Sequence, residues 1–108
     1  MSLRDLKWST REKKIARAAY EKAYKAEMQQ IHEAVYKKVK DFRDENDVWR
    51  LHDYLTRKRR EVDEKYDYRY SVLIFVLGRV LREGLISDED VEGLSHDKVA
   101  IIRRFLEI

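Results

Sequence analysis

The residues best suited to chemistry lie in one segment of the chain, between positions 49 and 63. The segment contains Trp49, His52, Asp53 and the basic run Arg57-Lys58-Arg59-Arg60. His52 is a candidate base, and Asp53 is a carboxylate that would have to orient it. Adjacent residues of a helix point about 100° apart, however, so the two do not easily form such a pair. The residue types in this segment therefore favour recognition over catalysis.

The chain lacks the residues that other reaction chemistries need. The chain has no cysteine, no Gly-x-Ser-x-Gly nucleophile elbow and no glycine-rich phosphate loop. Its histidines, His32, His52 and His96, form no H-x-x-x-H or H-E-x-x-H pair, so we expect no zinc site. We predict a protein that is not an enzyme and that has no catalytic residue, metal or cofactor.

Trp49 is the most unusual residue of the segment. At about 100° per residue it shares a helical face with His52, Asp53 and Arg60, away from the apolar stripe of the same helix. Its ring either packs against a neighbouring helix or anchors a protein interface, where Trp and Arg are enriched. Asp53 offers a charge for a partner's arginine. Arg59 falls between the two faces, where its stem can cover apolar surface while its guanidinium stays free.

The charge distribution weighs against nucleic acid as the partner. The chain has 24 Lys and Arg against 21 Asp and Glu, a net charge of +3. Residues 1–43 carry 12 basic and 6 acidic groups, and the rest of the chain has a small acidic excess. The run at 57–60 can contact phosphates, but acidic residues follow it on the same helix. A basic helical dimer that binds nucleic acid is the less favoured alternative.

Long helices must position these residues. The 108 residues include no proline, and all three glycines follow residue 77, so the first 77 residues contain neither helix breaker. The apolar run 72–77 is too short to span a bilayer, and residues 1–5 contain no signal-peptide core. We therefore expect an all-α, cytoplasmic protein with a single domain.

The first helix is longer than a chain of this size can cover. Ser9 and Glu12 form a capping-box pattern, and nothing interrupts the helix before residue 44. About 33 residues give about 50 Å of helix, whereas a compact chain of this length has a radius of gyration of about 13 Å. We predict a homodimer, and the alternative is a helix broken near residues 23–26 and folded back. The predicted dimer interface comprises Tyr24, Met28, Ile31, Val35, Val39 and Trp49.

Shorter helices are expected in the rest of the chain. Asp47 is predicted to cap a second helix from about Val48 to Tyr66, and a third, apolar helix is expected from about Tyr70 to Glu83. Gly84 is expected to end the third helix. A short helix is then expected from Ser87 to Gly93, and Ser95 caps the last one. The residues expected to point inward from this last helix are Val99, Ile102, Phe105 and Leu106. Phe75 lies in an apolar run, which by itself indicates a core residue.

One block of the sequence resembles a known family. The block comprises Val48–Leu55, Lys58-Arg59, Glu61, Asp63, Lys65–Asp67, Arg69, Ser71-Val72, Ile74–Val76 and Glu83–Leu85. It resembles the cyanobacterial fluorescence recovery protein family over about forty residues without a gap. The first helix matches weakly, and the residues after Ile86 match moderately.

The resemblance implies an all-α fold within a single domain, residues 1–108. The long N-terminal helices, about residues 9–66, would form the stalk of an elongated antiparallel dimer. About residues 67–108 would form a small helical head. It also implies a non-enzymatic regulator of photoprotection. Members of the family bind the photoactivated red form of the orange carotenoid protein, mainly at its C-terminal domain. They accelerate its return to the orange form and promote its detachment from the phycobilisome. Association with the cytoplasmic side of the thylakoid membrane would be at most peripheral.

By the same resemblance, the family's functional residues fall on Trp49, His52, Asp53 and Arg59, and its head phenylalanine falls on Phe75. A lysine in the head of some members aligns with Ile101, which cannot make the same charged contact. A homologue of the same fold that acts on a different protein partner is therefore the alternative function.

Overall fold

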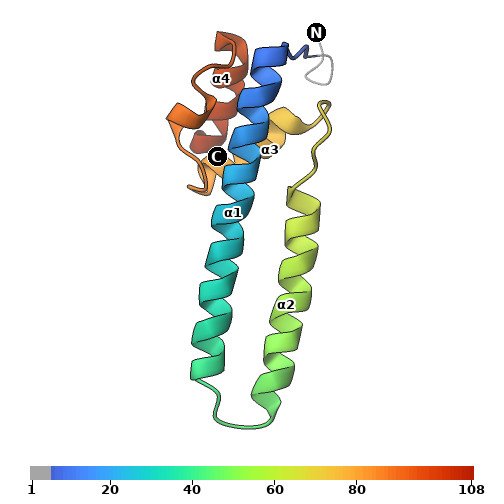
Figure 1. Ribbon diagram of the computed structural model, residues 1–108, viewed down its shortest axis with the longest axis vertical. Coiled ribbons are helices and arrows are strands. Elements are labelled where there is room, and N and C mark those ends of the chain that lie inside the picture. Colours follow the sequence, from blue (N-terminus) through green and yellow to red (C-terminus); the bar gives the residue numbers. More distant parts are fainter. Residues whose placement is uncertain (1–5) are drawn as a thin grey trace.

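All regular secondary structure in the described part of the chain is helical. The computed structural model describes residues 6–108. Its elements are α1 (Thr10–Lys40), α2 (Asn46–Lys65), α3 (Leu73–Arg82), the 3-10 helix η2 (Asp88–Val91), α4 (His96–Arg104) and the 3-10 helix η3 (Phe105–Glu107). The helices α1 and α2 form an antiparallel hairpin, and the later elements gather at one end of it (Figure 1). The predicted all-α class is confirmed.

The first helix is continuous and gives the molecule its elongated shape. It begins at the predicted capping box, in which Ser9 Oγ accepts the Glu12 N–H at 3.1 Å and Glu12 accepts the Ser9 N–H at 3.0 Å. No break occurs near residues 23–26, so the folded-back alternative is wrong. The radius of gyration is 16.8 Å and the extents are 55 × 27 × 24 Å. The helix ends at Lys40, slightly before the predicted end. The Phe42 N–H donates to the Val39 carbonyl oxygen just after it.

The predicted role of Asp47 as the cap of α2 is wrong. The helix already includes Asn46, so Asp47 lies in its first turn. The Asp47 carboxylate accepts the backbone N–H groups of Arg43 and Asp44 at 2.7 and 3.1 Å and also binds Arg50. These hydrogen bonds lower the pKa of Asp47 from 3.8 to about 2. Asp47 thus closes the hairpin loop instead of capping the helix.

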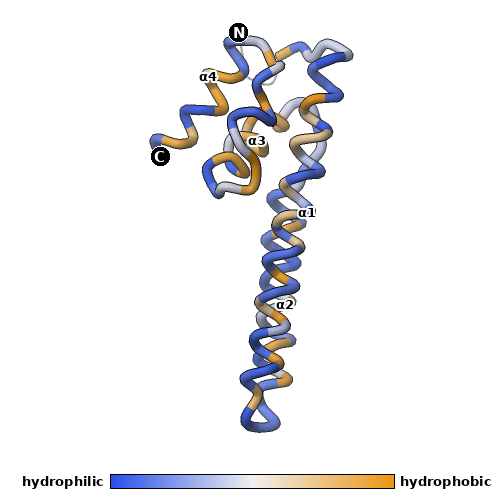
Figure 2. Tube along the Cα trace, turned by 60° about the vertical axis from the view of Figure 1, so that its left-hand side comes forward, coloured by the Kyte–Doolittle hydropathy of each residue, from blue (hydrophilic) through white to orange (hydrophobic). Residues whose placement is uncertain are grey.

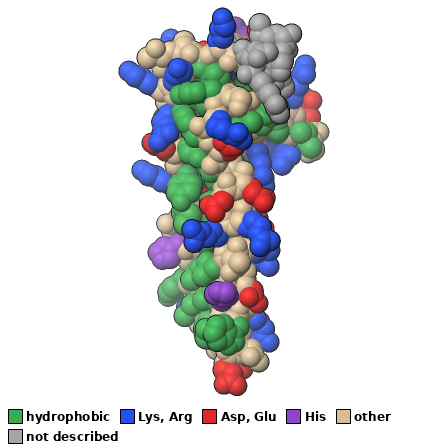
Figure 3. Space-filling view, turned by 90° about the vertical axis from the view of Figure 1, so that its right-hand side faces the viewer, with side chains coloured by type: hydrophobic (Ala, Val, Ile, Leu, Met, Phe, Trp, Pro, Cys, Tyr) green, Lys and Arg blue, Asp and Glu red, His purple; other side chains and the backbone are tan. Residues whose placement is uncertain are grey.

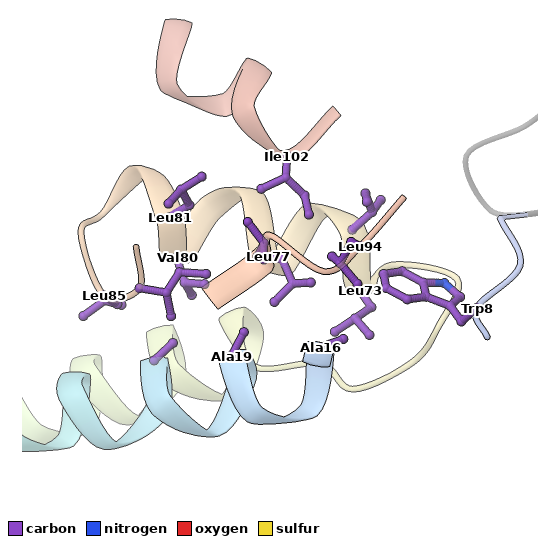
Figure 4. Close-up of a cluster of buried hydrophobic side chains, with 14 residues drawn as sticks. Trp8, Ala16, Ala19, Leu73, Leu77, Val80, Leu81, Leu85, Leu94 and Ile102 are labelled. Carbon is purple, nitrogen blue, oxygen red and sulfur yellow. The ribbon is translucent and has the colours of Figure 1, made fainter. Parts of the chain in front are cut away.

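The hydrophobic core surrounds α3. Leu73, Ile74, Leu77 and Val80 of this helix are fully buried. They pack between alanines of α1 and residues of the C-terminal elements, including Ile102 of α4 (Figure 4). Figure 2 shows hydrophobic residues concentrated in α3 and scattered along the stalk. The core therefore joins the first half of α1 to the head.

The connector between α2 and α3 is longer than predicted. Residues 66–72 are not helical, and α3 begins at Leu73 rather than at Tyr70. Tyr66 and Tyr68 instead place their rings edge-on against Tyr20, with centroids 5.4 and 4.8 Å away. Aromatic packing of this kind stabilises the connector against α1, and it outweighs local helix propensity.

The turns of the head follow the predicted cap residues. Gly84 has a φ of 75°, which glycine adopts without strain, and it follows the last turn of α3. Ser87 forms a capping box with Asp90, and Ser95 caps α4. Ile102 points into the core as predicted, but the inward prediction for Leu106 is wrong. Leu106 lies in η3, after α4 has ended, and its side chain is exposed.

Lys7 and Trp8 are held against α4 by the buried side chain of Lys98. Lys98 Nζ lies 4.9 Å from the centre of the Trp8 ring and donates to Lys7 O at 2.6 Å. It also donates to both carboxylate oxygens of Glu12 at 3.1 Å, and Glu12 accepts the Ser95 N–H at 3.0 Å. Glu12 therefore connects the start of α1 to the start of α4.

Acid is expected to weaken this contact through Glu12. Burial alone would raise the pKa of Glu12, but the N–H groups of Ser9 and Ser95 together with Lys98 outweigh it and lower the pKa from 4.5 to about 2. A carboxylate with a lowered pKa gives stability that is complete above about pH 4.5 and is lost as the pH falls toward 2. Glu12→Gln should lower the free energy of unfolding by roughly 1.5–3 kcal/mol at pH 7. Between pH 6 and pH 3 the variant should then lose less stability than the unmodified protein. Urea unfolding of both proteins from pH 6 to pH 3 measures this, and identical pH profiles would contradict it.

Candidate protein-binding surface

The ring of Trp49 lies on the outside of α2. Its exposed fraction is 65%, so the interpretation that it packs against a neighbouring helix is wrong for the described chain. The ring meets His52 edge-on, with centroids 6.4 Å apart and planes at 77°. A large apolar ring is thus presented near the hairpin end of the molecule, as an interface anchor requires.

His52 and Asp53 do not form a catalytic pair. The distance from His52 Nδ1 to Asp53 Oδ1 is 3.6 Å, too long for a hydrogen bond, and both side chains are exposed. Neither side chain is among those that line the surface depressions near Arg59. The two residues instead add polar groups beside Trp49 on the outer surface of α2.

Arg59 lies between two surface depressions, in agreement with its predicted place between two faces of the helix. One depression lies on the polar side of α2 and includes Arg60 and Glu64 in its lining. The other is the groove between α1 and α2. The Arg59 side chain is 85% exposed, and its Nε lies 3.8 Å from Asp63 Oδ2. An exposed pair at that distance holds the guanidinium weakly, so Arg59 is available to a partner.

An open groove of about 450 Å³ separates the two long helices on one side. Its lining comprises Tyr24, Met28 and Ile31 from α1 with Leu55, Lys58, Arg59, Val62 and Asp63 from α2. The first three belong to the predicted dimer interface. The groove therefore brings that predicted stripe next to Arg59, with apolar side chains inside and charged ones along α2.

The apolar strip continues toward the hairpin loop. Val39 of α1 and both Val48 and Trp49 of α2 are exposed in that part of the stalk, and Val35 is half-buried. Figure 3 shows hydrophobic side chains and histidines gathered on this lower part of the stalk. Much of the predicted dimer interface is thus left uncovered by the chain itself.

Phe75 of α3 points outward, so its assignment to the core from its apolar neighbours is wrong. Its exposed fraction is 38%, and it lines a pocket of about 300 Å³ that includes Val72, Val76 and Glu64. Ile101 is half-buried and packs against the core, so it contributes apolar packing at that position. The head therefore offers an aromatic contact at Phe75, separate from the surface around Trp49.

The model of a known protein family matches residues 8–105, nearly the whole chain. Its description is photoprotection regulator fluorescence recovery protein. The chain belongs to the fluorescence recovery protein family. It is accordingly a regulator of photoprotection and not an enzyme.

The chain is similar to members of the fluorescence recovery protein family over most of its own length and most of theirs. The fluorescence recovery protein of Synechocystis sp. is 40% identical over 96 residues, which is 89% of this chain and 88% of the relative. The solved structure of that protein has a TM-score of 0.88 at 37% identity, and that of the Fremyella diplosiphon protein has 0.88 at 36%. Each comparison covers 94% of this chain and 100% of the solved chain.

None of the helices within residues 6–108 is long and apolar enough to cross a membrane. The four residues that the family resemblance assigns to function in the stalk are Trp49, His52, Asp53 and Arg59. All four side chains are exposed on α2, in the arrangement described above.

The sequence reasoning missed a buried group of charges where α2 meets the head. Lys65 Nζ donates to both carboxylate oxygens of Glu27 at 2.8 and 2.9 Å and also binds Glu83. The hydroxyl of Tyr66 donates to Glu27 at 2.8 Å. Burial and the neighbouring Glu27 raise the pKa of Tyr66 well above its usual value of 10. A signal was available, because Glu27 and Lys65 each lie three positions after an apolar residue of the groove, Tyr24 and Val62, and residues three apart share a helical face.

Proposed function

We propose that the protein binds the photoactivated red form of the orange carotenoid protein, mainly at its C-terminal domain. It accelerates the return of that protein to the orange form and promotes its detachment from the phycobilisome, which restores antenna fluorescence. The observation that carries this proposal is the exposed face of α2 with Trp49, His52, Asp53 and Arg59 on a member of this family. The same resemblance supports a cytoplasmic location, with at most peripheral association at the thylakoid membrane.

The mechanism rests on differential affinity. A binding protein shifts or speeds a conformational change only if it binds the closed arrangement, or the transition toward it, more tightly than the open one. Trp49 and Arg59 on α2 would supply one contact, and Phe75 on the head a second. Two contacts on one elongated molecule can favour a particular arrangement of the two domains of the partner.

The active form in this proposal is a homodimer. Two single-domain chains would pair antiparallel along residues 9–66, leaving the heads at residues 67–108 free. The proposed interface comprises Tyr24, Met28, Ile31, Val35, Val39 and Trp49. The exposed apolar strip and the groove along α1 and α2 support it, because apolar surface of this kind is stabilised by burial. Light scattering at micromolar concentration tests it, and a monomer alone would reject it.

The central test is the recovery assay. The purified protein is mixed with photoactivated orange carotenoid protein, and the red-to-orange absorbance change is followed in darkness. The proposal expects a rate that rises with the concentration of the added protein. A rate equal to that of the carotenoid protein alone would reject the proposed partner and favour a different protein partner.

Replacing Arg59 by leucine should lower activity without unfolding the protein. The side chain is 85% exposed, so its loss removes a charge available to a partner rather than a core contact. Arginines at hot spots of interfaces contribute about 2 kcal/mol or more, which corresponds to about a 30-fold higher concentration for half-maximal acceleration. Recovery rates measure the effect, and circular dichroism checks that helical content is unchanged.

Arg57→Leu is the matched control for this substitution. Arg57 lies two positions earlier, about 200° around the helix, and is not part of the groove lining. It undergoes the same change in charge and should retain activity. Equal loss in both variants would show a general effect of positive charge and contradict the specific role of Arg59.

A further inference from the structure

Phe105 covers the one glycine of α3 and contacts Phe75. The two phenylalanine rings have centroids 6.2 Å apart, with an interplanar angle of 65°. Phe75 belongs to α3, whereas Phe105 begins η3 at the C-terminal end of the chain. The exposed ring of Phe75 is thus supported from one side by a residue thirty positions away.

Gly78 makes this contact possible. A Cβ atom placed on Gly78 would overlap the Phe105 ring, with its Cγ and Cε1 atoms only 2.6 Å away. Gly78 has an ordinary helical backbone, since Gly84 is the one glycine with a positive φ. The absence of a side chain at position 78 therefore serves the close approach of Phe105 and not the backbone conformation. A glycine inside a helix costs about 1 kcal/mol relative to alanine, so this approach has a cost in local stability.

We propose that Phe105 is a positioning residue that holds the ring of Phe75 in its binding orientation, and that Gly78 provides the space for it. The inference rests on the proposed function, in which Phe75 contacts the partner. An exposed aromatic ring loses rotamer freedom on binding, and a neighbour that already restricts it reduces that cost. Edge-to-face aromatic pairs have the geometry to impose such a restriction.

The test combines recovery rates with three substitutions. Phe75→Ala is expected to raise the concentration for half-maximal acceleration about 30-fold, as for a hot-spot aromatic residue. Gly78→Ala and Phe105→Ala each leave Phe75 in place and are expected to raise it about 3- to 10-fold. Adding Phe105→Ala to Phe75→Ala should cause little further loss, because Phe105 acts through Phe75.

Gly93→Ala is the matched control for Gly78→Ala. A Cβ atom at Gly93 would meet the end of the flexible Ile15 side chain, which can move aside. The same substitution in the same head should therefore leave recovery unchanged. Thermal unfolding of each variant shows whether it folds, and Phe105→Ala keeps the inference testable if Gly78→Ala does not fold.

A spectroscopic readout separates positioning from stability. A 4-fluorophenylalanine at position 75 reports the surroundings of that ring through its ¹⁹F chemical shift. Gly78→Ala and Phe105→Ala should move this shift toward that of the free amino acid while the protein remains folded. An unchanged shift in the folded variants would show that Phe105 does not define the surroundings of the Phe75 ring, and it would overturn the inference.

The outcomes distinguish this inference from the proposed function. If the unmodified protein has no effect on recovery, the proposed function fails, and the binding role of the aromatic pair fails with it. If the protein is active but Phe75→Ala is harmless, the inference fails alone. It also fails alone if Phe75→Ala reduces activity while Gly78→Ala and Phe105→Ala do not.

Discussion

Replacing Lys65 by methionine is expected to lower the free energy of unfolding by about 3–5 kcal/mol. The Lys65 side chain is 5% exposed and its partner Glu27 is 9% exposed. Removing the lysine would leave the Glu27 carboxylate buried with the Tyr66 hydroxyl as its remaining hydrogen-bond donor. Since small domains unfold with only 5–15 kcal/mol in total, this is among the largest losses that one substitution can cause.

The size of the effect follows from where the pair lies. Lys65 is the last residue of α2, Glu27 lies in α1, and Glu83 follows α3, so one ammonium group connects three helices. Arg79 in turn donates to Glu83 at 2.9 Å. Without Lys65, the end of α2 would lose its ion pair with α1 at the point where the connector of residues 66–72 begins.

Two controls isolate the buried charge. Lys22→Met removes a lysine that pairs with Asp90 at 3.0 Å but whose side chain is 57% exposed, so it should cost less than about 1 kcal/mol. The double variant Glu27→Met/Lys65→Met removes both charges and should recover most of the stability lost in Lys65→Met. Urea unfolding at one fixed protein concentration measures all four proteins. A Lys65→Met loss no larger than that of Lys22→Met would contradict the prediction.

Local sequence signals predicted the order of the helices and the caps at Ser9 and Ser95, but not the cap of α2. The Ser9 capping box, the uninterrupted α1 and the turn at Gly84 all depend on interactions within a few residues, which can be read directly from the chain. The predicted start of α3 is three residues early because the packing of Tyr66 and Tyr68 on Tyr20 is a contact between distant segments. Local propensity contains no information on such contacts.

The candidate site was only partly predictable for the same reason. Helical spacing placed Trp49 and Asp53 on one face and Arg59 at its edge, because a single helix determines those positions. Spacing could not decide whether the Trp49 ring is covered, since that depends on where α1 lies. Sequence alone assigns Phe75 to the core because five apolar neighbours surround it in the run 72–77, whereas the fold leaves that side of α3 open.

Replacing Trp49 by alanine is expected to raise the concentration for half-maximal acceleration of recovery by at least about 30-fold. The ring is 65% exposed in the chain, so its removal takes away little packing within the protomer, and helical content should not change. Indole rings bury the largest area of any side chain on binding, which is why their truncation has large effects at interfaces. The recovery assay measures activity, and circular dichroism measures helical content.

Tyr36→Ala is the matched control, because Tyr36 is also a large aromatic residue of the stalk and is 66% exposed. It lies outside the predicted dimer and partner surfaces, so its loss should leave recovery unchanged. Equal losses in the two variants would contradict a specific role for Trp49.

Protein concentration separates the two possible roles of the Trp49 ring, in the dimer interface and in the contact with the partner. If Trp49 acts in the dimer interface, the variant should scatter light as a monomer at low concentration and regain activity as concentration rises. If it contacts the partner instead, the variant should remain dimeric and inactive across the same range.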